Sequence, residues 1–265
     1  MRREKSNYVI QSVSHALDVL EQFAGDADEI GVTELSKLLK LHKNNVFRLL
    51  ATLESRGYLE QNRATENYRL GIRCLQLGQG FVQGMGLLRQ ARPILAELGQ
   101  QARETTYVAI LRRNAIVPVL VNDADRPVRI TSQLGEALPL HSTAVGKVTL
   151  AHETDDELRA LLPEPLPRFT ERTLVDRQAL NSQLKSISSQ GYAIDMGEHI
   201  EDVRAVAAPI RDYTRAVVGT MAIAGPAYRL QAERMEKELA PLLVKAAREL
   251  SGRLGFDGAR REPGS

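Results

Sequence analysis

The stretch that decides the fold is residues 37–59, KLLKLHKNNVFRLLATLESRGYL. It predicts a helix that runs to about Arg56 and buries apolar side chains at helical spacing, namely Val46, Leu49, Leu50 and Leu53. Gly57 follows, at the position where a left-handed residue commonly ends a helix. A break around Leu41 and His42 separates this helix from a shorter one before it. Two helices joined by about three or four residues are typical of a helix-turn-helix.

The segments on either side extend this pattern. Upstream, apolar residues at helical spacing predict a helix over about 12–24, and Thr33 stands where the N-cap of a short helix at 34–39 belongs. Downstream, two aromatic and branched stretches at 58–60 and 68–70 flank residues 62–67 and predict a β-hairpin. A hairpin directly after a helix-turn-helix is a wing.

The remaining sequence predicts a second domain. A glycine-containing helix over 72–86 is expected to act as a linker and a hinge, and another helix follows at 88–104. Strands are expected at 106–111, 115–121, 128–133, 192–195, 203–211 and 216–224, and helices at 144–151, 155–162, 178–190 and 229–254. Because strands and helices mix without a strict βαβ rhythm, the class is α+β with a largely antiparallel sheet. The expected organisation is a winged helix-turn-helix at 1–71, a linker helix at 72–90, a second domain at 91–254 and a disordered tail at 255–265.

Composition excludes several classes of protein. Hydrophobic residues make up 43% of the chain and charged residues 26%, which is ordinary for a soluble globular protein. No apolar run approaches the roughly 20 residues that cross a bilayer, so no membrane partner is expected. The first residues lack the apolar core of a signal peptide, which favours a cytoplasmic location. A single cysteine, Cys74, excludes an internal disulfide and a cysteine-rich metal site.

Positive charge is concentrated in the segment that contains the helix-turn-helix. Residues 37–73 hold eight Lys and Arg residues and three acidic ones, a local net charge of +5, although the whole chain carries only +2. This block is a candidate surface for DNA phosphates. On charge alone, a solvated basic face without a partner is an equally good interpretation.

The second helix of a helix-turn-helix lies in the major groove, and its first residues meet the base edges. Asparagine can bond adenine in a bidentate pair, and Lys or Arg can bond guanine or phosphate. The alternative is that Asn44 and Asn45 only cap the helix and that Arg48 forms a surface ion pair. Arginines in the wing favour DNA. The candidate DNA-binding residues are Thr33, Lys43, Asn44, Asn45, Phe47, Arg48, Arg63 and Arg69.

Several ordered motifs resemble the IclR family of bacterial transcription regulators. They are QSVSHALDVL at 11–20, RLLATLESRGYL at 48–59, YRLG at 68–71, LPLHSTAVGK at 138–147, RFT at 168–170, GYAID at 191–195, VRAVAAPI at 203–210 and AGP at 224–226. The similarity spans about residues 9–254. It implies a GAF-like effector-binding second domain, homodimers that often pair into tetramers, and a palindromic double-stranded operator.

The resemblance also implies a pocket between the sheet and residues 141–147. Carried over position by position, its lining would be Ile130, Ala144, Val145, Asp195, Ala205, Ala222 and Ala224. Many family members have cysteine at the position of Ala205 and carboxylate-binding serines at the positions of Ala222 and Ala224. Without those hydroxyls, a buried carboxylate loses hydrogen bonds worth about 1 to 3 kcal/mol each. The resemblance therefore implies a small organic acid or aromatic effector, and these departures favour one more apolar than glyoxylate or pyruvate, such as an aromatic compound.

Other functions have weaker support. His141 and Lys147 could indicate acid–base chemistry, but a histidine at an apolar helix entrance is more often structural. His199, Glu198 and Asp195 could indicate a metal site, but no HExxH or Cys/His spacing supports one. The sequence also lacks a Gly-x-Ser-x-Gly elbow and a glycine-rich phosphate loop. We therefore expect no catalytic residue, metal or cofactor, and a winged domain that binds protein instead of DNA is the remaining alternative.

Overall fold

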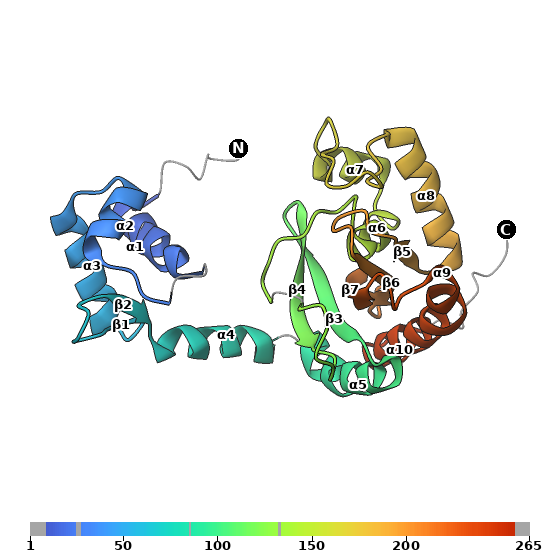
Figure 1. Ribbon diagram of the computed structural model, residues 1–265, viewed down its shortest axis with the longest axis horizontal. Helices are drawn as coiled ribbons and strands as arrows, with labels where there is room; N and C mark the ends of the chain where they lie inside the picture. The colour runs from blue at the N-terminus through green and yellow to red at the C-terminus, as the bar shows by residue number, and fades with distance from the viewer. Residues whose placement is uncertain (1–8, 25–27, 85, 132–133, 258–265) are drawn as a thin grey trace. The chain divides into compact units, whose positions relative to one another are not determined.

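The computed structural model describes residues 9–24, 28–84, 86–131 and 134–257. The chain forms two compact units, residues 1–84 and 85–265 (Figure 1). Each unit has its own apolar core.

The first unit is a three-helix core with a hairpin. It comprises α1 (Gln11–Glu21) with a 3-10 turn at Gln22–Ala24, α2 (Val32–Leu39), α3 (Lys43–Ser55), β1 (Leu59–Gln61), β2 (Tyr68–Leu70) and α4 (Ile72–Gly84). Strands β1 and β2 pair antiparallel. The core between the helices and the hairpin consists of Val19, Phe23, Ile30, Leu35, Val46, Leu50, Leu53, Leu59 and Tyr68. This confirms the predicted helix-turn-helix and wing.

The predicted N-cap of α2 is wrong, whereas the predicted end of α3 is confirmed. The N-cap of α2 is Gly31, so the expectation that Thr33 caps this helix is wrong. Helix α2 begins one residue before Thr33, at Val32, and Thr33 lies inside the first turn with its side chain exposed. Gly57 has a φ of 75°, which confirms the left-handed residue expected after α3.

The second unit is built on an antiparallel sheet. In the described residues its strand order is β4-β3-β7-β6-β5, with β3 at Thr105–Arg112, β4 at Ala115–Asn122, β5 at Ala193–Asp195, β6 at Val203–Arg211 and β7 at Val217–Pro226. The register places Asp195 opposite Ala205, and Ala205 opposite Ala224. These residues come from three separate strands and lie side by side on the sheet.

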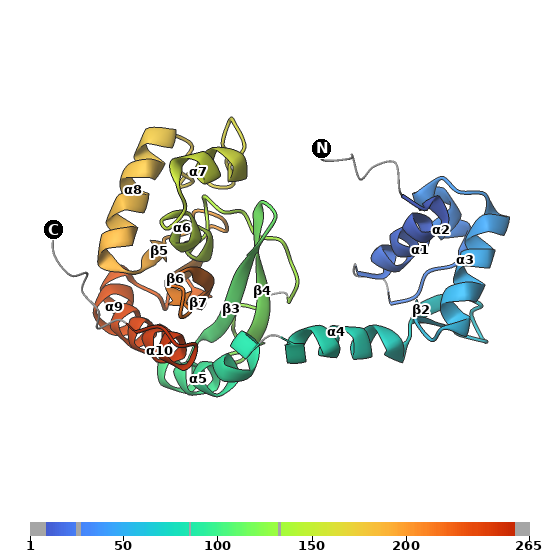
Figure 2. The ribbon, with the colours of Figure 1, turned by 180° about the vertical axis from the view of Figure 1, so that it is seen from behind.

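Helices cover both faces of this sheet (Figure 2). Helices α5 (Gly86–Ala102) and α10 (Ala240–Arg253) pack on one face, and α6 (Ala144–Leu150) with α8 (Arg177–Gln190) packs on the other. Helix α7 (Asp155–Leu161) follows α6, while α9 (Ala232–Arg234) and a π-helical turn at Met235–Leu239 lead into α10. The helix expected over 229–254 is thus confirmed over residues 232–253, with one π-helical turn inside it.

One predicted strand is wrong. Residues 128–131 have no regular structure, and residues 132 and 133 lie outside the described residues. The carbonyl groups of this segment accept hydrogen bonds from side chains instead of from a neighbouring strand. Thr105 Oγ1 donates to the carbonyl of Ile130 at 2.6 Å, and Arg229 donates to that of Val128 at 3.0 Å. Of the tail expected to be disordered, 255–265, residues 258–265 lie outside the described residues. The backbone N–H of Phe256 donates to the carbonyl of Ser251 at 2.9 Å, so the start of this tail is attached to α10.

Candidate DNA-binding surface and effector pocket

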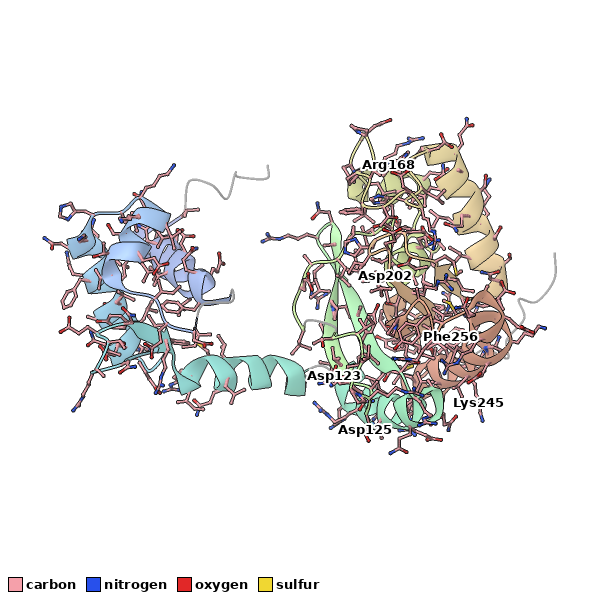
Figure 3. All side chains as sticks on the ribbon, viewed as in Figure 1. Asp123, Asp125, Arg168, Asp202, Lys245 and Phe256 are labelled. Carbon is pink, nitrogen blue, oxygen red and sulfur yellow. The ribbon has the colours of Figure 1, made fainter. Side chains whose placement is uncertain are left out.

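Helix α3 separates a buried face from an exposed one. Val46, Leu50 and Leu53 are buried in the core. The side chains of Lys43, Asn44, Asn45, Phe47 and Arg48 are exposed at the start of the helix. Side chains project from α3 into solvent (Figure 3). The structure therefore brings five of the candidate DNA-binding residues together on a single helix end.

The polar groups of the side chains on this surface are available to bind a partner. The N-cap of α3 is His42, whose ring nitrogen accepts from the backbone N–H of Asn44 at 3.4 Å. Capping by Asn44 or Asn45 is therefore not the explanation for these asparagines. Within the described residues, neither asparagine amide has a hydrogen-bond partner, and Arg48 forms no ion pair.

The wing presents one free arginine and one paired arginine. Arg69 on β2 forms an exposed ion pair with Glu60 on β1 at 3.3 Å. Arg63 lies exposed in the turn between the strands, with no ion pair in the described part of the chain. The carboxylate of Glu29 holds the turn by accepting from Asn62 and Thr65, each at 2.8 Å. These two hydrogen bonds lower the pKa of Glu29.

The second unit contains a hollow at one end of its sheet. Its volume is about 110 Å³, and an apolar cavity of about 150 Å³ is known to hold a benzene ring. The lining comes from β3, β5, β6, β7, the start of α6 and two irregular segments. It consists of Tyr107, Ile130, Thr131, Glu136, Leu138, Thr143, Ala144, Asp195, His199, Ile200, Val203, Ala205 and Ala224.

Asp195 is a buried carboxyl group in this hollow. Its Oδ1 accepts from the backbone N–H groups of Gly197 and Glu198, at 2.9 and 2.7 Å. Burial nevertheless raises the pKa of Asp195 to about 6. Burial also raises the pKa of Tyr107 and lowers that of His199. Both of these side chains are therefore neutral at pH 7, and the described lining contains carboxyl groups but no Lys or Arg.

A buried ion pair lies behind the hollow. The ammonium of Lys147 on α6 is fully buried and donates to Glu198 Oε1 and to the carbonyl of Ile194, the latter at 2.9 Å. His141 bonds the carbonyl of Pro167 at 2.8 Å. Phe169 contacts the rings of His141 and His199. His141 and Lys147 thus both have structural partners.

The predicted pocket residues divide into two groups. Ile130, Ala144, Asp195, Ala205 and Ala224 line the hollow. Val145 and Ala222 are fully buried in the adjoining core and do not line it.

The hollow also contains residues that the sequence analysis missed. Strand alternation places Tyr107 on the same sheet face as Ala224, because Tyr107 pairs with Ala222 on the neighbouring strand. Strand alternation could therefore have predicted Tyr107 from the sequence. Glu136, His199 and Ile200 lie in irregular segments, where the sequence has no periodicity that could place them.

The described residues show neither a metal site nor a membrane-spanning helix. Those residues hold no cluster of three or more His, Cys, Asp or Glu side chains suited to a metal ion. None of the described helices is both long enough and apolar enough to cross a membrane.

A winged helix-turn-helix with an exposed basic helix, followed by a domain with a ligand-sized hollow, defines a class of DNA-binding transcription regulators. Two family models match the chain: the IclR helix-turn-helix domain at residues 12–63 and the bacterial transcriptional regulator IclR C-terminal domain at residues 79–252. The chain belongs to the IclR family, whose members are transcription regulators and not enzymes.

Individual relatives are similar over nearly their whole length. The HTH-type transcriptional regulator KdgR of Escherichia coli strain K12 is 35% identical over 92% of this chain and 94% of its own. A crystal structure of a transcriptional regulator from Rhodococcus sp. RHA1 matches with a TM-score of 0.85 at 29% identity, over 93% of this chain and 98% of that one. An IclR homologue from Microbacterium hydrocarbonoxydans, crystallised with 4-hydroxybenzoate, matches with a TM-score of 0.81 at 24% identity, over 92% and 98% of the two chains.

Proposed function

We propose that this regulator binds a palindromic operator in the cytoplasm as a homodimer, and that a small hydroxylated aromatic compound in the hollow of residues 85–265 controls this binding. The observation that carries the DNA-binding role is the exposed, unpartnered start of α3, which offers two asparagine amides and an arginine on one helix end. In a winged helix-turn-helix this end meets the base edges of the major groove.

Substitution separates base reading from phosphate contact. Asn44→Ala and Asn45→Ala should each reduce the preference for the operator over random duplex by about 1 to 3 kcal/mol if the amide pairs with adenine. Arg63→Ala should weaken binding to all sequences alike and reduce the salt slope by about one. Gel shifts at several salt concentrations measure both effects, and Arg159→Ala, an exposed arginine on α7, is the control. A winged domain that binds protein would show no DNA phenotype for any of these variants.

The dimer is supported by an unpartnered apolar face formed by α1 and the two residues before it. Val9, Ile10, Val13 and Leu17 recur at helical spacing, and each is more than half exposed. A second copy of the chain would cover this face, and two copies would present two α3 helices to the two halves of a palindrome. Val13→Glu with Leu17→Glu should convert the dimer to a monomer in sedimentation equilibrium. An unchanged mass of the double variant would place the dimer contact elsewhere. If the unaltered protein is a tetramer, its mass will be four times that of one chain.

The effector class is supported by the charges of the hollow. A carboxylate effector would find two acidic side chains, Glu136 and Asp195, and no cation in the described lining. The apolar lining of Ile130, Leu138 and Ala205 suits one ring, and the Asp195 carboxylate can accept a hydrogen bond from a hydroxyl group. The 4-hydroxybenzoate crystallised with the Microbacterium homologue likewise combines one ring with a hydroxyl group, although its carboxylate would find no cation among the described residues of this lining.

A thermal-shift and calorimetric screen tests this assignment. A ligand that binds the native state at 100 times its Kd stabilises it by about 2.7 kcal/mol. Phenols without a carboxylate should raise the melting temperature, whereas glyoxylate and pyruvate, which bring a carboxylate and no ring, should not. Tight binding of a small keto acid, with aromatics inert, would refute the proposal. Control of transcription further requires that the ligand change operator affinity, since coupling needs unequal affinity for two states.

A further inference from the structure

Phe47 is a large apolar side chain that α3 leaves in water. Its exposed fraction is 57%, while its neighbour Val46 is completely buried. Phe47 lies outside the apolar core of residues 1–84 and forms no aromatic pair within the described residues. The folded unit therefore gains little from this ring, and a partner that covers it would remove apolar surface from water.

The residues beside Phe47 on the helix surface indicate which kind of partner covers it. Phe47 stands three residues after Asn44, next to Arg48 and four residues before Ala51, so these side chains share one exposed side of α3. The apolar face proposed for dimerisation lies on α1 instead. From Lys43 to Leu53 the helix carries no acidic residue that would repel phosphates. A duplex that meets Asn44 and Arg48 also meets Phe47, and the small side chain of Ala51 lets the helix approach closely.

The chemistry of the major groove identifies the contact. Base edges there present hydrogen-bond donors and acceptors, which a phenyl ring cannot pair, and one apolar group, the 5-methyl of thymine. We propose that Phe47 contacts the 5-methyl group of a thymine in each operator half-site, beside the bases that Asn44 and Arg48 meet, and so determines specificity. This inference rests on the operator binding proposed above.

Replacing single thymines by deoxyuridine tests the contact, because deoxyuridine lacks only the methyl group. In the operator mapped by footprinting, one position per half-site should weaken binding of the unaltered protein about fourfold, which corresponds to the roughly 0.8 kcal/mol of one buried methyl group. Phe47→Ala should bind the thymine and deoxyuridine operators equally. Phe47→Leu, which keeps an apolar side chain, should retain part of the difference.

Controls separate this contact from loss of fold or of general affinity. Leu38→Ala removes another exposed apolar side chain, 55% exposed on α2, and should keep the full fourfold difference. Arg48→Ala should weaken both operators by the same factor. If the protein binds its operator but no deoxyuridine substitution matters, or if the difference survives in Phe47→Ala, the inference is overturned and the regulator remains. If no duplex is preferred over random DNA, operator binding itself is refuted.

Discussion

The buried pair Lys147–Glu198 gives the sharpest stability prediction. Lys147 Nζ is fully buried and has two acceptors, Glu198 Oε1 and the carbonyl of Ile194. Lys147→Met keeps the length of the apolar stem and removes only the charge and the donors. Each acceptor left without its donor costs about 1 to 3 kcal/mol, and the loss of one partner of a buried pair costs about 3 to 5 kcal/mol in total.

This cost translates into a melting shift. For a unit of this size, 1 kcal/mol corresponds to about 2 to 4 °C, so Lys147→Met should lower the melting temperature of residues 85–265 by roughly 10 °C in scanning calorimetry of the full chain. Effector binding should weaken as well, because α6 and the segment around Glu198 carry opposite walls of the hollow.

Two further variants make the test decisive. Lys245→Met, an exposed lysine on α10, should change stability by less than about 0.5 kcal/mol. Lys147→Met combined with Glu198→Leu replaces both charges by apolar groups and should recover most of the lost stability. A loss below about 2 °C in the single variant, or a double variant as unstable as the single one, would refute the assignment of this pair as a coupled, buried interaction.

Three other predictions concern single residues. Because burial raises the pKa of Asp195 to about 6, the folded state holds this proton more tightly than the unfolded state; the resulting stability is present below about pH 4 and is lost as the pH rises through 6. Asp195→Asn should remove this pH dependence, on the order of 3 kcal/mol, from urea unfolding curves. Gly146→Ala should lower the melting temperature of residues 85–265 in calorimetry, because the new Cβ would lie 2.2 Å from the carbonyl oxygen of Leu140 and the backbone would have to shift. Gly57→Ala, at a φ of 75°, should destabilise residues 1–84 by about 1 kcal/mol or more in thermal melts.

The DNA-binding unit was largely predictable from sequence, for local reasons. The helix over α3 follows from apolar spacing, the left-handed Gly57 marks its end, and the paired strands of the wing are bounded by polar turn residues. Each signal lies within a few residues of the structure it specifies. The misplaced N-cap at Thr33 is the typical boundary error, since Gly31 supplies an extended backbone without any side-chain signal.

The hollow was only partly predictable, because distant residues build it. Asp195, Ala205 and Ala224 come together through strand register and not through sequence spacing. The segment at 128–131 has the composition of a strand, yet Thr105 and Arg229 bind its carbonyls and hold it off the sheet. His199 and Ile200 line the hollow from a loop that has no periodic pattern. Long-range pairing of this kind lies outside the reach of local propensity.

The strand order has a consequence for how the protein is made. Strand β3 pairs with β7, so Thr105 cannot pair until Ala224, more than a hundred residues later in the chain, has been synthesised. The helix-turn-helix is complete by residue 84. At roughly 5 to 20 residues per second, synthesis leaves the DNA-binding unit folded for about 7 to 28 seconds before the sheet of the second unit can close. During that interval the DNA-binding unit is folded without a completed effector-binding domain.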